Sequence, residues 1–248
     1  MTVYSALITG AAGGIGQALC REFQQAGYHV IGLDLLSTTM PDSCAVKIDA
    51  DLEAICSNSE YRKKIFAQVR SHLVANPIKV LINNAAIQIL KPATALTLDD
   101  WNATLNVNLL APFLLIQAFL SSLTNNKGSI VNIASVHTRL TKPEFACYAT
   151  SKAALAGLTR SLSVEISDRV RINAIAPAAV ATPMLLAGFH DRAEALEQLS
   201  KMHPIGHIAT PQEVAQAALF LASDQANFIT GTMLDLHGGI GNRLYDPA

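Results

Sequence analysis

A tyrosine and a lysine four positions apart are the residues of this sequence best suited to move a proton. Tyr148 and Lys152 stand at the ends of the segment YATSK, inside a stretch that we expect to be helical. Positions i and i+4 of a helix share one face. A free phenol has a pKa near about 10 and is a poor base at neutral pH. An ammonium about 5 Å away stabilises the phenolate by about 3 kcal/mol at an effective dielectric of about 20, so we expect Lys152 to lower the pKa of Tyr148.

Ser135 is a third polar residue that this pair could use. It stands just after the apolar run 129–133, at the end of an expected strand, where ligands collect in parallel sheets. Its hydroxyl could hold a carbonyl or alkoxide oxygen beside Tyr148. A tyrosine and a lysine at this spacing also occur as surface pairs, and a lone serine after a strand is ordinarily a turn residue. The three residues therefore indicate a proton-transfer site only when they are taken together.

The sequence TGAAGGIG at residues 9–16 offers a cradle for phosphate groups. It lies between the first expected strand and the first expected helix. Glycines there permit a tight turn and let backbone N–H groups approach a pyrophosphate at the positive end of the helix. A Walker-type phosphate loop would need a following Lys-Ser or Lys-Thr, which this turn lacks. We therefore expect a dinucleotide to bind at Gly10, Gly14, Ile15 and Gly16.

An aspartate about twenty residues further on discriminates between the two nicotinamide dinucleotides. Asp34 ends the second expected strand, where a carboxylate accepts hydrogen bonds from ribose hydroxyls. The same charge opposes a 2′-phosphate by about 2 kcal/mol at about 4 Å in water, or roughly thirtyfold in affinity. No basic residue stands at Leu35 or Gly13 to offset this repulsion. We expect NAD rather than NADP, with Asp49 facing the adenine; a solvated aspartate at the strand end is the alternative to this role for Asp34.

The composition of the chain argues against several other kinds of partner. Its 248 residues are 50% hydrophobic and 15% charged, with a net charge of −1, so a large core is available. This balance gives no electrostatic reason to expect nucleic acid or an anionic membrane as a partner. The four cysteines show no metal-binding spacing, and we expect no metal site. The cysteine usage and the lack of a signal-peptide pattern favour a reducing, cytoplasmic location.

Strand and helix patterns alternate along the whole chain. Apolar runs predict strands at residues 3–9, 29–33, 45–48, 78–82, 129–133, 170–175 and 233–236, and helical periodicity predicts helices at 14–26, 60–75, 98–123, 146–167 and 210–221. This alternation predicts a single α/β domain over residues 1–248, with a doubly wound, parallel, seven-stranded sheet and helices on both faces. The longest apolar stretch, 109–123, is too short to cross a bilayer comfortably and is expected to be a core or interface helix.

Residues 178–208 interrupt the alternation of strands and helices. This insertion follows the strand at 170–175, so it lies beyond the carboxyl end of a strand, where ligands bind in such sheets. It contains apolar residues around Met184 and then a charged stretch at 191–201. We expect it to be a substrate lid, with Met184 near the substrate. A helical hairpin on the surface is the alternative.

Taken in order, the motifs of this chain resemble those of the short-chain dehydrogenase/reductase family over nearly its whole length. The resemblance rests on residues 9–16, Asn83-Asn84-Ala85, Asn108 within NVNL, Ser135 within NIAS, Tyr148 with Lys152, NAIAP at 173–177 and ITG at 229–231. It implies a Rossmann fold and an NAD(P)-dependent oxidoreductase. Such an enzyme interconverts a secondary alcohol and a ketone by hydride transfer, with the tyrosine as general acid and base.

The resemblance also implies roles for individual residues and an oligomeric state. It implies a proton relay of Asn108, Ser135, Tyr148 and Lys152, a cofactor contact from Asn84, and nicotinamide carboxamide binding by Val180 and Thr182. In that relay Asn108 fixes a water next to Lys152, which also hydrogen-bonds the nicotinamide ribose. Family members are commonly homotetramers, so we expect a homo-oligomer, a tetramer or a dimer, with the helices at 98–123 and 146–167 at the interface.

Three positions depart from the family pattern. Ala86 and Ala178 stand where the family usually has glycine, and His237 replaces a common aspartate before two glycines. If residue 178 needed a positive φ, alanine would strain the loop by about 1 kcal/mol. We expect these changes to be tolerated.

The substrate is the least defined part of the site. Gln88 and His137 stand where related 3-hydroxybutyrate dehydrogenases hold a carboxylate, but the basic residue that those enzymes place three before the tyrosine is here Phe145. Hydroxy acids, sugars, polyols and cyclic alcohols therefore stay open. Two other functions are a non-catalytic nucleotide sensor and a 3-oxoacyl reductase using NADPH. The intact catalytic set argues against the first, and Asp34 argues against the second.

Overall fold

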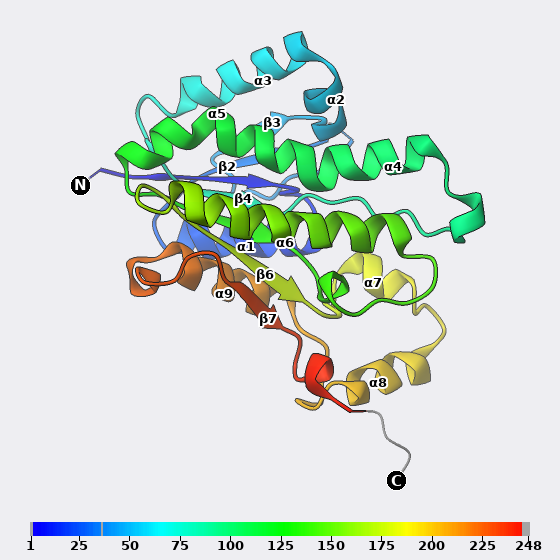
Figure 1. The fold of residues 1–248 in the computed structure, drawn as a ribbon. Helices are drawn as coiled ribbons and strands as arrows, with labels where there is room; N and C mark the ends of the chain where they lie inside the picture. The colour runs from blue at the N-terminus through cyan, green and yellow to red at the C-terminus, as the bar shows by residue number, and fades with distance from the viewer. Residues whose placement is uncertain (1, 36, 245–248) are drawn as a thin grey trace.

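Seven parallel strands form one sheet in the computed structural model, which describes residues 2–35 and 37–244, except for the side chain of Met184 (Figure 1). The strands are β1 (Ser5–Thr9), β2 (His29–Asp34), β3 (Val46–Asp49), β4 (Ile78–Asn83), β5 (Ser129–Ile133), β6 (Arg171–Pro177) and β7 (Met233–Leu236). They lie in the order β3-β2-β1-β4-β5-β6-β7, and each adjacent pair is parallel. The chain order reverses between β1 and β4, where such sheets bind ligands.

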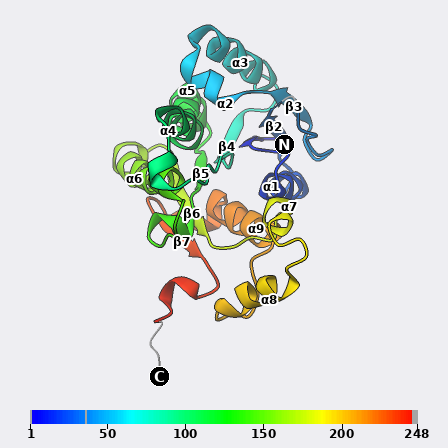
Figure 2. The same cartoon turned by 90° about the vertical axis from the view of Figure 1, so that its right-hand side faces the viewer.

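Helices cover both faces of this sheet. They are α1 (Gly14–Gln25), α2 (Leu52–Ser57), α3 (Ser59–His72), α4 (Leu98–Leu105), α5 (Ala111–Asn125), α6 (Ala146–Ile166), α7 (Pro183–Ala187), α8 (Ala193–Met202) and α9 (Pro211–Ala222). Figure 2 shows α4, α5 and α6 on one side of the sheet and α1 and α9 on the other. The predicted fold class, a doubly wound α/β sheet with helices on both faces, is confirmed.

Alternate residues of the central strands divide the apolar core into two layers. Leu7, Leu81 and Ile130 belong to the cluster with α3 and α5, whereas their neighbours Ile8 and Ile82 pack with α1 and α9. This division follows from the side-chain period of two along a strand. Because both faces are covered, these strands are continuously apolar, which is the pattern that predicted them.

The structure corrects several element boundaries. Helix α2 lies in a stretch for which no helix was expected; Asp51 starts it by accepting the N–H groups of Glu53 and Ala54. The helix expected at 98–123 consists of α4 and α5 joined by a π-helical turn at Asn106–Leu110, and it extends to Asn125. A π turn inserts one residue and shifts the apolar register by one position, but the residues that follow it are mostly apolar, so the sequence does not reveal the shift.

The stretch from Leu98 to Asn125 is also longer than expected. Its 28 residues are enough to cross a membrane by length and composition, with 44% of its most apolar window buried. The expectation of too short a span concerned only the apolar run 109–123, and the helix as a whole is longer than that run. Leu115, Phe119 and Leu123 are fully buried against the sheet, which is the behaviour of a core helix.

The insertion after β6 contains two helices. Figure 1 shows α7 and α8 beyond the arrowheads of β6 and β7, at the carboxyl edge of the sheet. Residues of this segment return to the sheet near Ala209, whose N–H donates to the carbonyl oxygen of Ala179 at 3.0 Å. Helix α9 then begins at Pro211 with a capping box, in which Thr210 and Glu213 hydrogen-bond each other's backbone N–H groups.

Candidate active site

The glycine turn between β1 and α1 has no room for a side chain at two positions. Gly10 has a φ of +66°, which favours glycine, and a Cβ there would lie 2.8 Å from the Cα of Ala85. A Cβ on Gly16 would lie 1.8 Å from the carbonyl oxygen of Gly10. Helix α1 begins at Gly14 after Gly13, and no side chain caps its first N–H groups. Those N–H groups can donate to phosphate oxygens, so the turn fits the pyrophosphate of a dinucleotide.

Asp34 is held at the edge of this turn. Its Oδ2 accepts the backbone N–H of Ala12 at 2.8 Å, and its Oδ1 accepts the N–H of Leu35 at 2.8 Å. Each carboxylate oxygen keeps a second lone pair, which can accept a ribose hydroxyl. Asp49 lies beside Asp34 in the register of β2 and β3, with its side chain exposed. Both carboxylates therefore stand at the carboxyl edge of the sheet, on neighbouring strands.

Asn84 fastens the end of β4 to the glycine turn. Its side-chain Nδ2 donates to the carbonyl oxygens of Thr9 at 2.9 Å and Gly10 at 3.1 Å. Its backbone N–H donates to the hydroxyl of Thr9 at 3.0 Å. The side-chain donors are thus engaged in shaping the turn, a contact that the sequence did not predict. Ile15 lies half-buried in the first turn of α1.

Ser135, Tyr148 and Lys152 lie together between the end of β5 and the start of α6. The ammonium nitrogen of Lys152 is 5.7 Å from the centre of the Tyr148 ring and donates to the carbonyl oxygen of Ile133 at 2.7 Å. A hydrogen bond joins the side chains of Ser135 and Tyr148. The hydroxyl oxygen of Ser135 also accepts the backbone N–H of His137 at 3.2 Å. The fold thus brings together three residues that the sequence separates by up to 17 positions.

Burial governs the protonation of two of these side chains. It raises the pKa of Tyr148, and the hydrogen bond with Ser135 acts in the opposite direction. Burial also lowers the pKa of Lys152 to about 8, so this lysine is still mostly protonated at neutral pH. The expectation that Lys152 lowers the pKa of Tyr148 is therefore wrong for the protein alone. Both groups lose hydration, and that loss dominates.

Asn108 lies at the centre of the π-helical turn and is fully buried. Its Oδ1 accepts the N–H of Ile87 at 2.9 Å, and its Nδ2 donates to the carbonyl oxygen of Ile87 at 3.0 Å. The same Nδ2 donates to the hydroxyl of Ser151 at 3.0 Å, which donates to the carbonyl oxygen of Tyr148 at 2.7 Å. Sequence reasoning missed Ser151, although its place within YATSK put it one helical turn from the tyrosine.

The departures from the family pattern cause no visible backbone strain. Ala86 and Ala178 are not among the described non-glycine residues with a positive φ. The N–H of Ala178 donates to the carbonyl oxygen of Leu236 at 3.1 Å, as a regular continuation of the β6–β7 pairing. His237 uses Nδ1 to accept the N–H of Gly239 at 3.1 Å. A ring nitrogen here takes the acceptor role that a carboxylate could fill.

Val180 and Thr182 link the inserted segment to the rest of the site. Val180 is buried and forms an isolated parallel bridge with Ala209. Thr182 starts α7 by accepting the N–H of Leu185 on its hydroxyl at 3.2 Å. A Cβ on Gly14 would lie 2.9 Å from the Cβ of Thr182. The entry to α7 therefore contacts the glycine turn directly.

An aromatic cluster lines one side of the Tyr148 ring. His137 stacks on Phe145 with ring centres 4.3 Å apart and an interplanar angle of 3°, and its ring meets Tyr148 edge-on at 5.7 Å. The ammonium of Lys142 lies 4.7 Å from the centre of the Phe145 ring. Burial lowers the pKa of His137, and the charge of Lys142 lowers it further. His137 is thus next to the tyrosine, as a residue that contacts substrate must be.

The other two residues expected at the substrate are less constrained. Gln88 lies in an exposed part of the segment that follows β4. The side chain of Met184 lies outside the described part of the structure. A cavity of about 140 Å³ lies behind the end of β6, lined by Ala178, His203, Ile205 and Leu236 among others. Neither Ser135 nor Tyr148 lines it, so it is separate from the reacting groups.

Comparison with known proteins assigns this arrangement to a family. A family model described as enoyl-(acyl carrier protein) reductase matches residues 10–241. The chain belongs to the short-chain dehydrogenase/reductase family. The 3β-hydroxysteroid dehydrogenase 1 of Eggerthella lenta is 32% identical over 94% of this chain and 92% of its own length. A 3-oxoacyl-[acyl-carrier-protein] reductase of Thermotoga maritima is 33% identical over 94% of this chain and 96% of its own.

Solved structures of the short-chain dehydrogenase/reductase family share the fold. The ligand-free aldohexose dehydrogenase of Thermoplasma acidophilum has a TM-score of 0.90 at 28% identity, over 100% of this chain and 97% of its own. A 4-hydroxyisoleucine dehydrogenase with NADH has a TM-score of 0.84 at 31% identity, over 97% and 100% of the two chains. A 3-oxoacyl reductase of Agrobacterium tumefaciens with NADP has a TM-score of 0.84 at 28% identity, over 96% and 94%. The protein is therefore an NAD(P)-dependent oxidoreductase that acts on CH–OH groups of small molecules.

Proposed function

We propose that this short-chain dehydrogenase/reductase uses NAD to interconvert a secondary alcohol and a ketone, with Tyr148 as general acid and base. The observation that carries the proposal is the contact of half-buried Tyr148 with buried Ser135 and buried Lys152 at the carboxyl edge of the sheet. A phenol in that position can exchange a proton with a substrate oxygen. A surface pair of tyrosine and lysine would have neither the serine partner nor the burial.

The preference for NAD rests on Asp34. Its carboxylate is fixed by the N–H groups of Ala12 and Leu35 beside the glycine turn, where it favours free ribose hydroxyls and opposes a 2′-phosphate. Asn84 and Ile15 border the same turn, and we assign both to the cofactor site together with Asp49, Val180 and Thr182. When bound, the nicotinamide ring supplies the hydride acceptor or donor.

The protein's own part in the reaction is to hold the substrate oxygen and move its proton. Deprotonated Tyr148 accepts the proton of the substrate hydroxyl during alcohol oxidation, and protonated Tyr148 returns it during ketone reduction. The hydroxyl of Ser135 donates to the substrate oxygen, while the N–H of His137 holds the serine in place. Lys152 is mostly protonated at neutral pH and its ammonium lies 5.7 Å from the centre of the Tyr148 ring, but in the protein alone burial outweighs this charge and raises the pKa of the tyrosine. Asn108 completes the relay by fixing α6 through Ser151.

The substrate is a small molecule that enters under the segment 178–208, which we propose to be a lid. Thr182, at the start of α7, contacts the glycine turn. A movement of α7 and α8 would therefore displace the residues that bind the cofactor. We place His137 beside the substrate because its ring meets Tyr148 edge-on. Gln88 and Met184 are the remaining substrate residues of this proposal.

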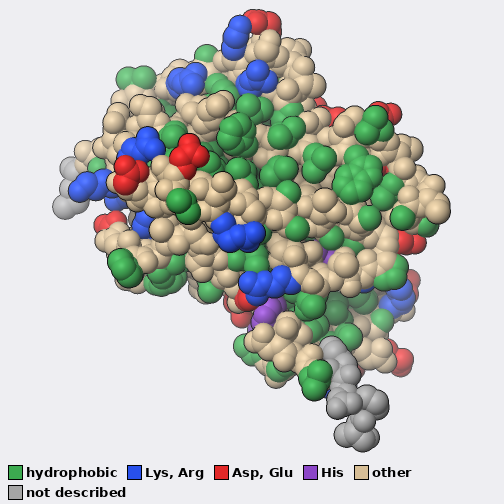
Figure 3. Space-filling view, viewed as in Figure 1, with side chains coloured by type: hydrophobic (Ala, Val, Ile, Leu, Met, Phe, Trp, Pro, Cys, Tyr) green, Lys and Arg blue, Asp and Glu red, His purple; other side chains and the backbone are tan. Residues whose placement is uncertain are grey.

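We further propose that the enzyme is a cytoplasmic homo-oligomer, a tetramer or a dimer. Figure 3 shows the face formed by α4, α5 and α6, where hydrophobic side chains gather in the upper half, over α4 and α5, and Lys and Arg side chains lie near and below the middle. On α4 and α6, Leu98 is 74% exposed and Val164 90%, and Leu110 in the π-helical turn is 43% exposed. An apolar face of this kind suits contact with a second copy. Light scattering after gel filtration tests this, and a monomer would contradict it.

Turnover with matched cofactors tests the proposed function. We expect a panel of secondary alcohols to reduce NAD faster than NADP, and Tyr148→Phe to lower kcat by about a hundredfold to ten-thousandfold. Tyr148→Phe should keep its thermal stabilisation by NAD, because the phenol oxygen does not contact the glycine turn. Tyr4→Phe, which removes a phenol hydroxyl just before β1 at the opposite edge of the sheet, is the matched control. Full activity of Tyr148→Phe would refute the role of the tyrosine. Thermal stabilisation of the wild type by NADP but not by NAD would favour the alternative function, a 3-oxoacyl reductase that uses NADPH.

A further inference from the structure

Two buried thiols touch each other in the half of the molecule that carries the glycine turn. The sulfur atoms of Cys20 and Cys44 lie 3.3 Å apart. Cys20 is on α1 and is 0% exposed, whereas Cys44 is 5% exposed and lies on the connection between β2 and β3. All four cysteines are free thiols. Neither cysteine of this pair has a part in the proposed reaction.

The thiol pair contacts the layer that supports the cofactor turn. A Cβ on Gly32 would lie 2.7 Å from the sulfur of Cys44 and 2.9 Å from the Cβ of Ala11. The sulfur of Cys44 and the side chain of Ala11 therefore lie on the same side of Gly32, in the space that a side chain there would fill. Ala11 donates its N–H to the carbonyl oxygen of Leu33, at 3.3 Å, one residue before Asp34. A shift of Cys44 would be transmitted through this contact to the turn and to the carboxylate.

We propose that Cys20 and Cys44 are a modification site, which small oxidants such as hydrogen peroxide close into a reversible disulfide, and that this bond weakens dinucleotide binding. We infer that the disulfide can form because the two sulfur atoms are in contact. Its effect on the dinucleotide rests on the proposed function of the glycine turn and Asp34. The two parts are tested by separate measurements.

The chemistry assigns different roles to the two thiols. The hydrogen bond with Cys20 lowers the pKa of Cys44, and the charge of Lys47 acts in the same direction; the hydrogen bond with Cys44 and burial raise the pKa of Cys20. Cys44 is therefore the better nucleophile. Its thiolate attacks hydrogen peroxide, which forms a sulfenic acid and releases hydroxide. The sulfur of Cys20 then displaces the hydroxyl group as water, so two thiols and one peroxide give one disulfide and two waters.

Closing the bond requires the sulfurs to approach to about 2.05 Å. Helix α1 packs against the sheet and beside α9, with Leu19 and Phe23 fully buried on either side of Cys20 in the sequence. Cys44 lies outside helices and strands, so the segment around it is the part that moves. The N–H of Ala12 donates to the carboxylate of Asp34. A displacement of Cys44 that moves the neighbouring glycine turn therefore disturbs this hydrogen bond and reduces affinity for the dinucleotide.

Peptide mapping tests the bond itself. The folded, reduced protein is treated with hydrogen peroxide, blocked with an alkylating reagent, digested and analysed by mass spectrometry. We expect a peptide linked through Cys20 and Cys44 that dithiothreitol separates. Cys44→Ser and Cys20→Ala should each abolish it, whereas Cys56→Ser, which removes a half-buried thiol on α2, should leave it unchanged. Absence of the linked peptide from the folded protein would overturn the proposal.

Titration of reduced and oxidised protein with NAD tests the consequence. We expect the oxidised form to bind NAD about fivefold more weakly, or worse, and Cys44→Ser to bind it equally well before and after peroxide. Because coupling between sites is reciprocal, saturating NAD should disfavour the disulfide by the same factor in a glutathione redox buffer. A linked peptide with unchanged NAD affinity would overturn the coupling but not the modification site. Failure of both forms to bind NAD would instead refute the proposed cofactor.

Discussion

The side-chain amide of Asn108 donates a hydrogen bond to the hydroxyl of Ser151, which in turn donates to the carbonyl oxygen of Tyr148. This chain connects the π-helical turn between α4 and α5 to the first turn of α6. Asn108 and Ser151 are both 0% exposed. A buried polar contact of this kind has a defined geometry, because any other arrangement leaves an unpaired group. Ser151 therefore sets the position of the helix that carries the tyrosine.

Ser151→Ala should lower kcat with little change in KM. Loss of one buried hydrogen bond costs about 0.5–1.5 kcal/mol, which corresponds to roughly a twofold to tenfold lower rate if it is lost from the transition state. Alanine keeps the helix itself stable. Steady-state kinetics with the best alcohol of the panel provide the measurement. Ser71→Ala is the control, because Ser71 makes the same hydroxyl contact one turn back on an exposed helix.

Equal kcat values for Ser151→Ala and the wild type would show that α6 is positioned without this contact. A loss of stability in both Ser151→Ala and Ser71→Ala would indicate a general effect of removing a serine. We expect the thermal midpoint of Ser71→Ala to stay within about 1 °C of the wild type, because exposed substitutions change the free energy of unfolding little.

Asp34→Asn should shift the cofactor preference toward NADP. The substitution keeps the size of the side chain and removes the charge that opposes a 2′-phosphate, which is about 2 kcal/mol or roughly thirtyfold in relative kcat/KM. The measurement is the ratio of kcat/KM for NAD and NADP in both proteins. Asp49→Asn is the matched control, since Asp49 is the neighbouring strand-end carboxylate and faces no phosphate in the proposed complex. An equal shift in both variants would point to long-range electrostatics instead.

The parts of the fold that follow from local patterns were predicted from the sequence. β5 and β7 begin and end at the predicted residues, because short apolar runs bounded by turn residues define a strand. The π-helical turn was missed, since the residues after it are mostly apolar and the one-residue shift in periodicity does not stand out among them. Helix α2 was missed because only six residues form it, and its start depends on the capping contact of Asp51.

Features of the site that depend on residue type and spacing were also predicted from the sequence, whereas features that depend on packing were not. Ser135, Tyr148 and Lys152 come together as expected, because their spacing places them at one edge of the sheet and on one helix face. The direction of the pKa shift of Tyr148 was wrong because it depends on burial, and burial depends on packing that no local pattern records. The contact of Cys20 with Cys44 joins residues 24 positions apart and was likewise invisible.

Burial of Lys152 makes the stability of the protein depend on pH. Its folded pKa of about 8 lies below its ordinary value of 10.5. Between these pH values the unfolded chain binds more protons than the folded one, so the free energy of unfolding rises with pH by up to about 1.4 kcal/mol per unit. Below pH 8 the buried charge carries its full cost, and above 10.5 the cost is gone.

A comparison with Lys152→Met isolates this effect. The variant lacks the titrating group, so its free energy of unfolding relative to the wild type should decrease as the pH rises from 8 to 10, measured by denaturant unfolding at each pH. Other groups titrate equally in both proteins and cancel. Lys64→Met removes an exposed lysine and should show no such trend. A constant difference between Lys152→Met and the wild type over this range would mean that Lys152 is not desolvated.

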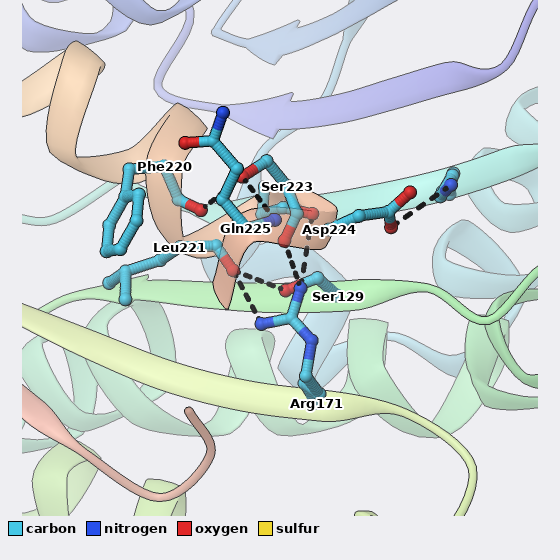
Figure 4. A network of polar contacts seen from close by, with 9 residues as sticks. Ser129, Arg171, Phe220, Leu221, Ser223, Asp224 and Gln225 are labelled. Atoms are coloured by element: carbon cyan, nitrogen blue, oxygen red, sulfur yellow. Dashed lines mark hydrogen bonds and ion pairs between the residues drawn. The ribbon is translucent and has the colours of Figure 1, made fainter. Parts of the chain in front are cut away.

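Arg171 holds the edge of the sheet opposite the active site. At the start of β6, its guanidinium donates to the carbonyl oxygens of Leu221 at 2.7 Å and Ser223 at 2.9 Å, and Ser129 donates to Leu221 from the neighbouring strand (Figure 4). The last carbonyl groups of α9 lack partners within their helix, and a cation there also favours the helix dipole. Arg171 thus fixes the end of α9 against the sheet.

Arg171→Ala should destabilise the protein without affecting its active site. Hydrogen bonds from a charged donor contribute about 1.5–3 kcal/mol, and losing this set should lower the thermal midpoint by roughly 4–10 °C. Affinity for NAD should stay unchanged, because β6 runs about 20 Å from Arg171 to its carboxyl end. Arg169→Ala removes an exposed arginine two residues earlier and should shift the midpoint by about 1 °C or less. A loss of NAD affinity in Arg171→Ala at temperatures where it is folded would show that the two edges of the sheet are coupled.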